Sequence, residues 1–188
     1  MIEQLRKKMK SLALLDAIIE QEWQYRYFSY NSNWSDSEEM GSLRDGCGGE
    51  WFLWFSGELA GYKCLSPEDG LMPELQEAKE SASEAFGSFI NEPAFSMDQA
   101  TCIWFLENSQ WTEHGKPVKW LIDLKAITNW EASDYHAWAT EYYEREIDLE
   151  AVEKILSGEF SEDLAKKLNP DIEMSELLAE LPEIGINS

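Results

Sequence analysis

Cysteine and histidine are the first residues of this sequence whose chemistry could support catalysis. Cys47 lies in a glycine-rich segment, and His114 and His136 are the two histidines. A histidine beside a cysteine can generate a nucleophilic thiolate. No spacing brings these residues together, and the acidic neighbours Asp45 and Glu50 would oppose thiolate formation. We therefore interpret Cys47 as a small residue in a turn, and we assign no catalytic residue.

Carboxylates are abundant, but they do not form a recognisable metal motif. The sequence has no CxxC, HExxH or EF-hand pattern. Glu141, Glu144 and Asp148 could share one side of a helix, but a solvated acidic surface explains that spacing equally well. The glycines at 46–49 precede an apolar run and lack the lysine of a phosphate-binding loop. We expect no metal and no cofactor.

Tryptophan could provide platforms for a sugar between paired carboxylates, as in glycoside hydrolases. Most of the nine Trp residues fall within apolar runs, where packing in a core is the default interpretation. Trp34 and Trp111 are flanked by polar residues instead. They are either anchors of a binding surface or covers for the edge of the core, because large aromatic residues are rarely fully buried.

The elements that must position these residues follow from hydrophobic periodicity. Apolar residues recur at intervals of three and four positions, which predicts an amphipathic helix from residue 2 to about 25 with Trp23 on its apolar side. Its basic residues Arg6, Lys7, Lys8 and Lys10 either destabilise its first turns or meet acidic parts of the fold. Extended segments are predicted at residues 27–34, 50–55, 59–65 and 101–106, with a further candidate at 118–122 that could equally begin a helix. Helices are predicted from Pro73 to about Phe89, after an N-cap at Ser133, and at 149–156, 162–168 and 174–181.

This order of elements predicts an α+β fold with an N-terminal helix, a small and mostly antiparallel sheet, and a helical C-terminal portion. We expect one domain over residues 1–188. Within it, 1–26 form the helix, 27–130 a strand-rich core with one helix, and 131–188 the helical portion.

The charge of the chain limits its partners. It has 37 Asp and Glu against 15 Lys and Arg, a formal net charge of −22, yet 44% of its residues are hydrophobic. That combination indicates a folded domain with a strongly negative surface. Such a surface repels nucleic acid and anionic membranes and attracts basic proteins. We expect no nucleic-acid partner and no membrane partner.

Three cysteines are too few for a disulfide framework. No secretion signal and no apolar stretch of about 18 residues is evident in the sequence. These features favour a cytoplasmic protein.

Several blocks resemble a family of small uncharacterised bacterial proteins with a YNSxW…EMxSxRxGxG pattern. They are YNSNW at 30–34, EMGSLRDGCG at 39–48, WFL at 51–53, PAF at 93–95, TCIW at 101–104, EYYE at 141–144, LNP at 168–170 and EIG at 183–185. The resemblance covers nearly the whole chain after the first helix, and it implies a single unit without implying an activity. Cys47 departs from the small polar residue that the family pattern has, which weakens a catalytic role for this thiol.

We hypothesise a non-enzymatic acidic protein that binds a basic protein partner, similar in general character to the immunity proteins that neutralise toxins. Charge would steer association and aromatic residues would anchor it. The predicted binding residues are Trp34, Asp36, Glu38, Glu39, Arg44, Asp45 and Trp111.

Two other hypotheses stay open. One is a small hydrolase or small-ligand-binding protein that uses Asp45, Arg44 and His114 around an aromatic pocket. A concave pocket that holds a carboxylate with a perturbed pKa would favour it. The other is that the acidity serves solubility alone.

Overall fold

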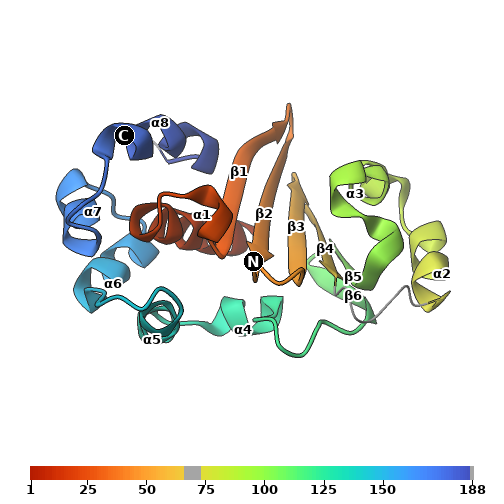
Figure 1. The fold of residues 1–188 in the computed structure, drawn as a ribbon. Coiled ribbons are helices and arrows are strands. Elements are labelled where there is room, and N and C mark those ends of the chain that lie inside the picture. Colours follow the sequence, from red (N-terminus) through yellow and green to blue (C-terminus); the bar gives the residue numbers. More distant parts are fainter. Residues whose placement is uncertain (66–72, 187–188) are drawn as a thin grey trace. The chain divides into compact units, whose positions relative to one another are not determined.

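The computed structural model describes residues 1–65 and 73–186 and has an α+β fold (Figure 1). An N-terminal helix is followed by a six-stranded antiparallel sheet and a helical C-terminal portion, as the sequence predicts. The contacts within the chain group its residues into two compact units. Unit 1 comprises Met1–Ile2 and Asn33–Asp123, and unit 2 comprises Glu3–Ser32 and Leu124–Ser188.

The strands follow one another across the sheet in chain order, from β1 to β6. They are β1 (Phe28–Ser35), β2 (Glu38–Arg44), β3 (Glu50–Ser56), β4 (Leu59–Leu65), β5 (Ala100–Glu107) and β6 (Gln110–Gly115). Each neighbouring pair from β2 to β6 is antiparallel. Two residues join β3 to β4, and Gly57 in this turn has φ of 52°, a positive value that tight hairpin turns require.

The apolar segments at 27–34, 50–55, 59–65 and 101–106 are confirmed as strands β1, β3, β4 and β5. Two strands, β2 and β6, were not predicted. Strand β2 contains Glu38, Glu39 and Gly41, residue types with low strand propensity. Its pairing with β3 therefore stabilises a strand that its own residues disfavour. Strand β6 is polar because it forms an edge of the sheet. The strand or helix start expected at 118–122 was wrong, since this segment forms a turn in which Leu121 N donates to Val118 O.

One face of the unit 1 sheet packs on short helices through an aromatic core. The helices are α2 (Pro73–Ser81), η2 (Glu84–Phe86), α3 (Gly87–Asn91), η3 (Pro93–Phe95) and η4 (Met97–Gln99). The core includes Phe52, Trp54, Phe89, Phe95 and Phe105. The single helix predicted from residue 73 to 89 is interrupted, because Ser83 accepts a hydrogen bond from Ala85 N and so starts a new helical turn.

Unit 2 is mainly helical. Its helices are α1 (Ile2–Ile19, of which residues from Glu3 belong to this unit), η1 (Trp23–Tyr25), α4 (Leu124–Asn129), α5 (Ala132–Tyr142), α6 (Leu149–Ser157), α7 (Glu162–Leu168) and α8 (Met174–Ile184). Helix α1 ends six residues before the predicted end at about residue 25. Trp23, expected on its apolar side, is 56% exposed.

Short polar side chains fix the starts of the C-terminal helices. Ser133 was predicted to cap α5, but Glu131 and Asp134 form a reciprocal capping box there. Asp148 caps α6 by accepting from Ala151 N, and Ser161 caps α7. These caps explain why the predicted bounds of α6 and α7 agree closely with the structure.

The basic residues of α1 contact the ends of other helices in unit 2. Lys7 Nζ donates to the carbonyl of Ser157, the last residue of α6. Lys8 Nζ donates to Trp130 O at 2.6 Å, just after α4, and burial lowers the pKa of this amine. The last carbonyls of a helix carry partial negative charge, so these contacts compensate for placing cations in the first turns of α1.

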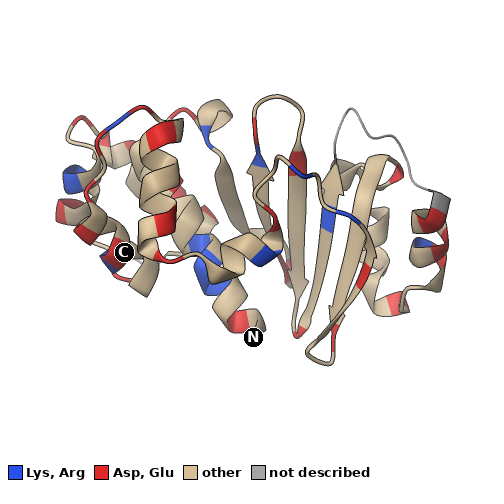
Figure 2. Cartoon of the chain, turned by 90° about the horizontal axis from the view of Figure 1, so that it is seen from below, with Lys and Arg blue, Asp and Glu red and all other residues tan. Residues whose placement is uncertain are grey.

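Negative charge is distributed over both units. Unit 1 contains 17 acidic and five basic residues, and unit 2 contains 20 acidic and ten basic residues. Asp and Glu outnumber Lys and Arg on both (Figure 2). Neither unit therefore offers a predominantly basic composition.

Candidate functional site

The seven residues predicted to bind a partner all belong to unit 1, but they lie in three places. Trp34, Asp36, Glu38 and Glu39 surround the β1–β2 turn. Arg44 and Asp45 lie at the other end of β2, about 20 Å away at ~3.4 Å per residue. Trp111 is on β6, which three strands, β3 to β5, separate from β2.

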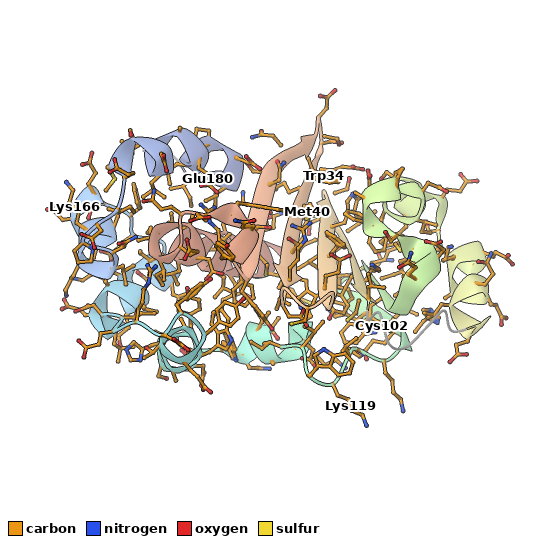
Figure 3. All side chains as sticks on the ribbon, viewed as in Figure 1. Trp34, Met40, Cys102, Lys119, Lys166 and Glu180 are labelled. Atoms are coloured by element: carbon orange, nitrogen blue, oxygen red, sulfur yellow. The ribbon has the colours of Figure 1, made fainter. Side chains whose placement is uncertain are left out.

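Trp34 is partly buried and packs against the core of unit 1 (Figure 3). Its ring stacks on that of Phe95, with centroids 5.6 Å apart and planes at 14°. Glu38 accepts a hydrogen bond from Ser88 Oγ. Asp36 is exposed in the turn, and Glu39 is half-buried. Of this group, Asp36 is the most available to a partner.

Arg44 and Asp45 support the β2–β3 connection. Arg44 Nε lies 3.5 Å from a carboxylate oxygen of Glu50, directly opposite it on β3. Asp45 Oδ1 accepts from Cys47 N at 2.8 Å and from Gly49 N at 2.9 Å. Both side chains therefore have local structural partners.

Trp111 packs edge-to-face on Trp104, with centroids 6.3 Å apart. The strand register places it in one row with Leu106, Ala60, Phe55 and Glu39. Trp111 and Glu39 are thus four strand spacings apart, roughly 19 Å. The structure does not bring the predicted residues into one patch, and their role in binding stays a prediction.

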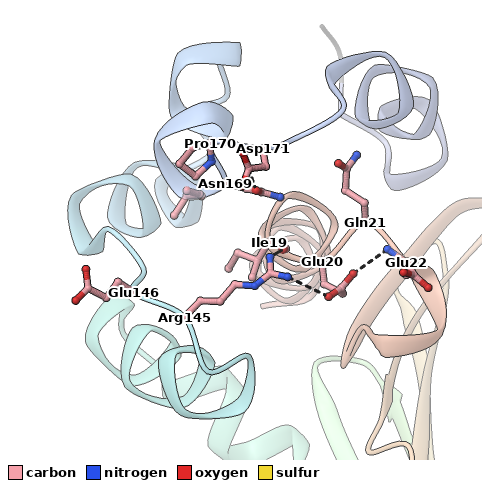
Figure 4. Close-up of a pocket in the computed structure, with 10 residues that line it drawn as sticks. Ile19, Glu20, Gln21, Glu22, Arg145, Glu146, Asn169, Pro170 and Asp171 are labelled. Atoms are coloured by element: carbon pink, nitrogen blue, oxygen red, sulfur yellow. Dashed lines mark hydrogen bonds and ion pairs between the residues drawn. The ribbon is translucent and has the colours of Figure 1, made fainter.

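A polar pocket of about 500 Å³ lies within unit 2 (Figure 4). Three segments form it: the end of α1, the chain after α5, and the end of α7. The lining residues are Ile19, Glu20, Gln21, Glu22, Arg145, Glu146, Leu168, Asn169, Pro170 and Asp171. None of these was among the predicted binding residues.

The end of α1 determines the chemistry of this pocket. An α-helix leaves its last four carbonyls without intrahelical partners, and they carry partial negative charge. Arg145 Nη1 donates to Ile19 O, and its Nη2 lies 3.6 Å from a carboxylate oxygen of Glu20. Asn169 Nδ2 donates to Ile18 O at 2.8 Å. The carbonyl of Ile19 and the carboxylate of Glu20 therefore bind the guanidinium group of Arg145 together.

A second arginine binds at the same helix end. Arg26 Nε donates to Glu20 O at 2.6 Å, and its Nη2 donates to Gln21 O at 2.8 Å. Both of its terminal nitrogens also contact the carboxylate of Glu180 on α8. The segment after α1 is therefore rich in acceptors arranged for planar, cationic donors.

The rim of the pocket is acidic, and exposed aromatic residues follow it directly. Glu22, Glu146 and Asp171 are exposed carboxylates. The next residues of the chain form η1, in which Trp23 is 56% and Tyr25 57% exposed. Aromatic residues are enriched at protein interfaces, so these exposed rings are candidate contact residues.

The polar neighbours of Trp23 indicate an exposed side chain, but the helical periodicity assigned it to the buried side of a helix. Trp23 is flanked by Glu22 and Gln24, as Trp34 and Trp111 are flanked by polar residues. Its spacing from Ile19 assigned it to the apolar side of α1, but that helix ends before reaching it. No sequence pattern brings Arg145 and Asn169 to the end of α1.

Asp16 is the carboxylate with the most perturbed environment in unit 2, and its role is structural. It is fully buried. Its oxygens accept from Phe28 N at 2.7 Å, Tyr27 N at 3.0 Å and Tyr135 Oη at 2.7 Å. Burial raises the pKa of Asp16 to about 6, and these hydrogen bonds oppose the rise. Because its oxygens face only protein donors, Asp16 is not available to a substrate.

Comparisons with protein-family models, curated proteins and solved structures find no match to this chain. Among the described residues, no group of three or more His, Cys, Asp and Glu could hold a metal ion. No helix in residues 1–65 or 73–186 is long and apolar enough to cross a membrane.

Proposed function

We propose that this chain is a non-enzymatic interaction protein that binds a basic protein partner, in the manner of an immunity protein that neutralises a toxin. The observation that carries the proposal is the acidic pocket at the end of α1 with the exposed rings of Trp23 and Tyr25 beside it. A cytoplasmic location is part of the same proposal.

The pocket already accommodates the kind of group that a basic partner would present. Arg145 and Arg26 from the chain itself use carbonyls at the end of α1 together with carboxylates. An arginine or lysine of a partner would find further carboxylates at Glu22, Glu146 and Asp171. The net charge of −22 would accelerate association with a cationic partner, and Trp23 and Tyr25 would provide the apolar contact that slows dissociation.

The alternative of a hydrolase or a small-ligand protein has weaker support. All ten residues that line the pocket are described, and none is aromatic. Arg44 and Asp45 lie by the β2–β3 turn, whereas His114 lies on β6, so three strands separate the groups expected to act together. The carboxylate of Asp16 is enclosed by protein donors.

The test begins with capture of a partner from a lysate of the native host at low salt, followed by titration of the purified partner. Alanine at both Trp23 and Tyr25 should weaken binding by at least about tenfold, since aromatic anchors typically contribute more than about 1 kcal/mol each. Neutralising the rim with Glu22→Gln, Glu146→Gln and Asp171→Asn should reduce the salt dependence of the association rate.

Trp120→Ala provides the matched control. Trp120 is 53% exposed but belongs to unit 1, so this variant should bind as the native protein does. Equal loss of affinity in the control and the Trp23/Tyr25 variant, or capture of no basic protein at low salt, would contradict the proposal.

A further inference from the structure

Two cysteines of unit 1 face each other across neighbouring strands. Cys64 on β4 is the register partner of Cys102 on β5. Directly opposite residues of an antiparallel pair point to the same face, with Cβ atoms about 4.5–5.5 Å apart. Both residues are completely buried, and Cys102 lies within the sheet (Figure 3).

The surroundings hold this pair in place. Thr101 Oγ1 donates to the carbonyl of Cys64 at 3.2 Å, which adds a cross-strand link beside the two thiols. Gly115 is the partner of Cys102 on β6, and a Cβ at this glycine would lie 2.9 Å from Cys102 Cα. The next pair along the same face is Tyr62 and Trp104, whose rings lie 4.9 Å apart. The strands on either side therefore pack closely against the pair.

The two thiols are also chemically linked. A hydrogen bond between Cys64 and Cys102, together with the backbone N–H of Val118, lowers the pKa of Cys64. Burial and the same hydrogen bond raise the pKa of Cys102. The first proton of the pair is therefore lost more easily than the second, because the remaining S–H stabilises the neighbouring thiolate.

We propose that Cys64 and Cys102 form a redox couple that a low-molecular-weight disulfide such as glutathione disulfide oxidises to an intramolecular cross-strand disulfide. The Cys64 thiolate attacks one sulfur of glutathione disulfide, which breaks the S–S bond and releases one glutathione thiolate. The Cys102 sulfur gives its proton to solvent, attacks Cys64 in the mixed disulfide and releases the second glutathione. Two protein thiols lose two electrons in total, and one glutathione disulfide becomes two thiols.

The burial of the pair determines how this reaction proceeds. A disulfide requires Cβ atoms about 3.5–4.5 Å apart, so the strands need only a small approach. The oxidant must reach the thiols first, which requires β4 and β5 to separate locally or the chain to be unfolded. Exposed Cys47 should therefore react faster than the pair in the folded protein, but without an intramolecular partner.

The experiment allows the full chain to refold from denaturant in buffers of defined glutathione to glutathione-disulfide ratio, so that access does not limit exchange. Thiols are then alkylated and the peptides are mapped by mass spectrometry. In both the native sequence and Cys47→Ser, we expect Cys64 and Cys102 to become protected together as one linked peptide, with the mass of two hydrogen atoms lost. Oxidation should also raise the melting temperature by several degrees, and dithiothreitol should reverse the increase.

Cys64→Ala and Cys102→Ala each remove one member of the couple. In either variant no cross-strand disulfide can form, so the remaining buried cysteine should be recovered as a thiol or as a mixed disulfide with glutathione, and no linked peptide of residues 64 and 102 should appear. Two results would overturn the proposal: Cys64 and Cys102 both remaining thiols in the most oxidising buffer, or each pairing with Cys47 or with glutathione instead of with the other.

Discussion

Asp16 links three parts of unit 2 through one buried carboxylate. Its oxygens hold the backbone at Tyr27 and Phe28, where β1 begins, and the hydroxyl of Tyr135 on α5. A buried carboxylate is costly when charged, and the donors only partly compensate for lost hydration. The charged Asp16 carboxylate therefore lowers the stability of the folded unit at neutral pH, although its hydrogen bonds connect three parts of that unit.

The pH dependence of stability should reveal this penalty. The pKa of Asp16 in the folded protein, about 6, lies above its ordinary value of 3.8. The folded state then binds the proton more tightly, so the contribution of Asp16 to stability is greatest below pH 4 and is lost as the pH rises to 6. The expected loss is about 3 kcal/mol at ~1.36 kcal/mol per pKa unit.

Asp16→Asn isolates this contribution from the other carboxylates. We expect the unfolding free energy of the native protein, relative to that of the Asn variant, to fall by about 2 kcal/mol between pH 4 and pH 7, because Asn does not titrate. Denaturant titrations at a series of pH values measure both curves. Parallel curves for the two proteins would mean that Asp16 does not titrate in this range.

At the scale of elements, Gly61 on β4 allows α3 to pack closely on the sheet. A Cβ at this position would lie 2.5 Å from ring carbons of Phe89, which is completely buried. Gly61→Ala must therefore displace the ring or the strand. We expect a loss of about 1–3 kcal/mol, the usual cost of overpacking a core, measured by denaturant unfolding.

Gly87, at the start of α3, provides the contrasting substitution. Its backbone is helical, and a Cβ there would have no heavy atom within 4 Å. Gly87→Ala should be neutral or stabilise the protein by up to about 1 kcal/mol, because alanine favours a helix. If Gly61→Ala were as mild as Gly87→Ala, the close approach of Phe89 to β4 would not restrict this position.

The elements that could be predicted from the sequence are those whose own residues favour them. The apolar run from Trp51 to Phe55 is buried throughout and forms β3, and the capped helices α6 and α7 begin where their caps indicate. Strand β2 depends on pairing with β3. At the end of α1, Arg145 binds the carbonyl of Ile19, and Arg26 binds that of Glu20 just after the helix. Tertiary interactions of this kind produce no periodic pattern in the sequence, so they could not be predicted from it.

At the scale of the whole molecule, repulsion between like charges opposes folding. Each unit has a net negative charge, and the total is −22. Repulsion among exposed carboxylates acts over about 10 Å at 0.1 M salt and over about 3 Å at 1 M salt. The compact state concentrates these charges, so screening should favour it.

We therefore expect sodium chloride to raise the melting temperature between low and moderate concentration. Differential scanning calorimetry at several salt concentrations measures the effect, with an uncharged osmolyte at matched osmolality as the control for exclusion effects. A melting temperature that falls as salt is added would show that attractive ion pairs, such as Arg145 with Glu20, outweigh the repulsion.

Composition predicts an acidic surface with aromatic anchors, but it does not predict where on the fold such a surface lies. An acidic surface with aromatic anchors was expected from the sequence, and the pocket with Trp23 and Tyr25 has that composition. Its position depends on the segments near Glu20, Arg145 and Asn169 meeting in space. Segments so distant in the sequence are brought together only by the tertiary fold.

The composition of unit 2 from both ends of the chain has a consequence for its synthesis. Unit 1 is nearly continuous from Asn33 to Asp123, so the ribosome releases it before most of unit 2 exists. Asp16 and Tyr135 are separated by 119 residues. At roughly 5–20 residues per second, α1 waits on the order of ten seconds for α5 to emerge. During that interval the apolar side of α1 lacks the α5 residues that it packs against in the folded unit, so it is a natural target for chaperones.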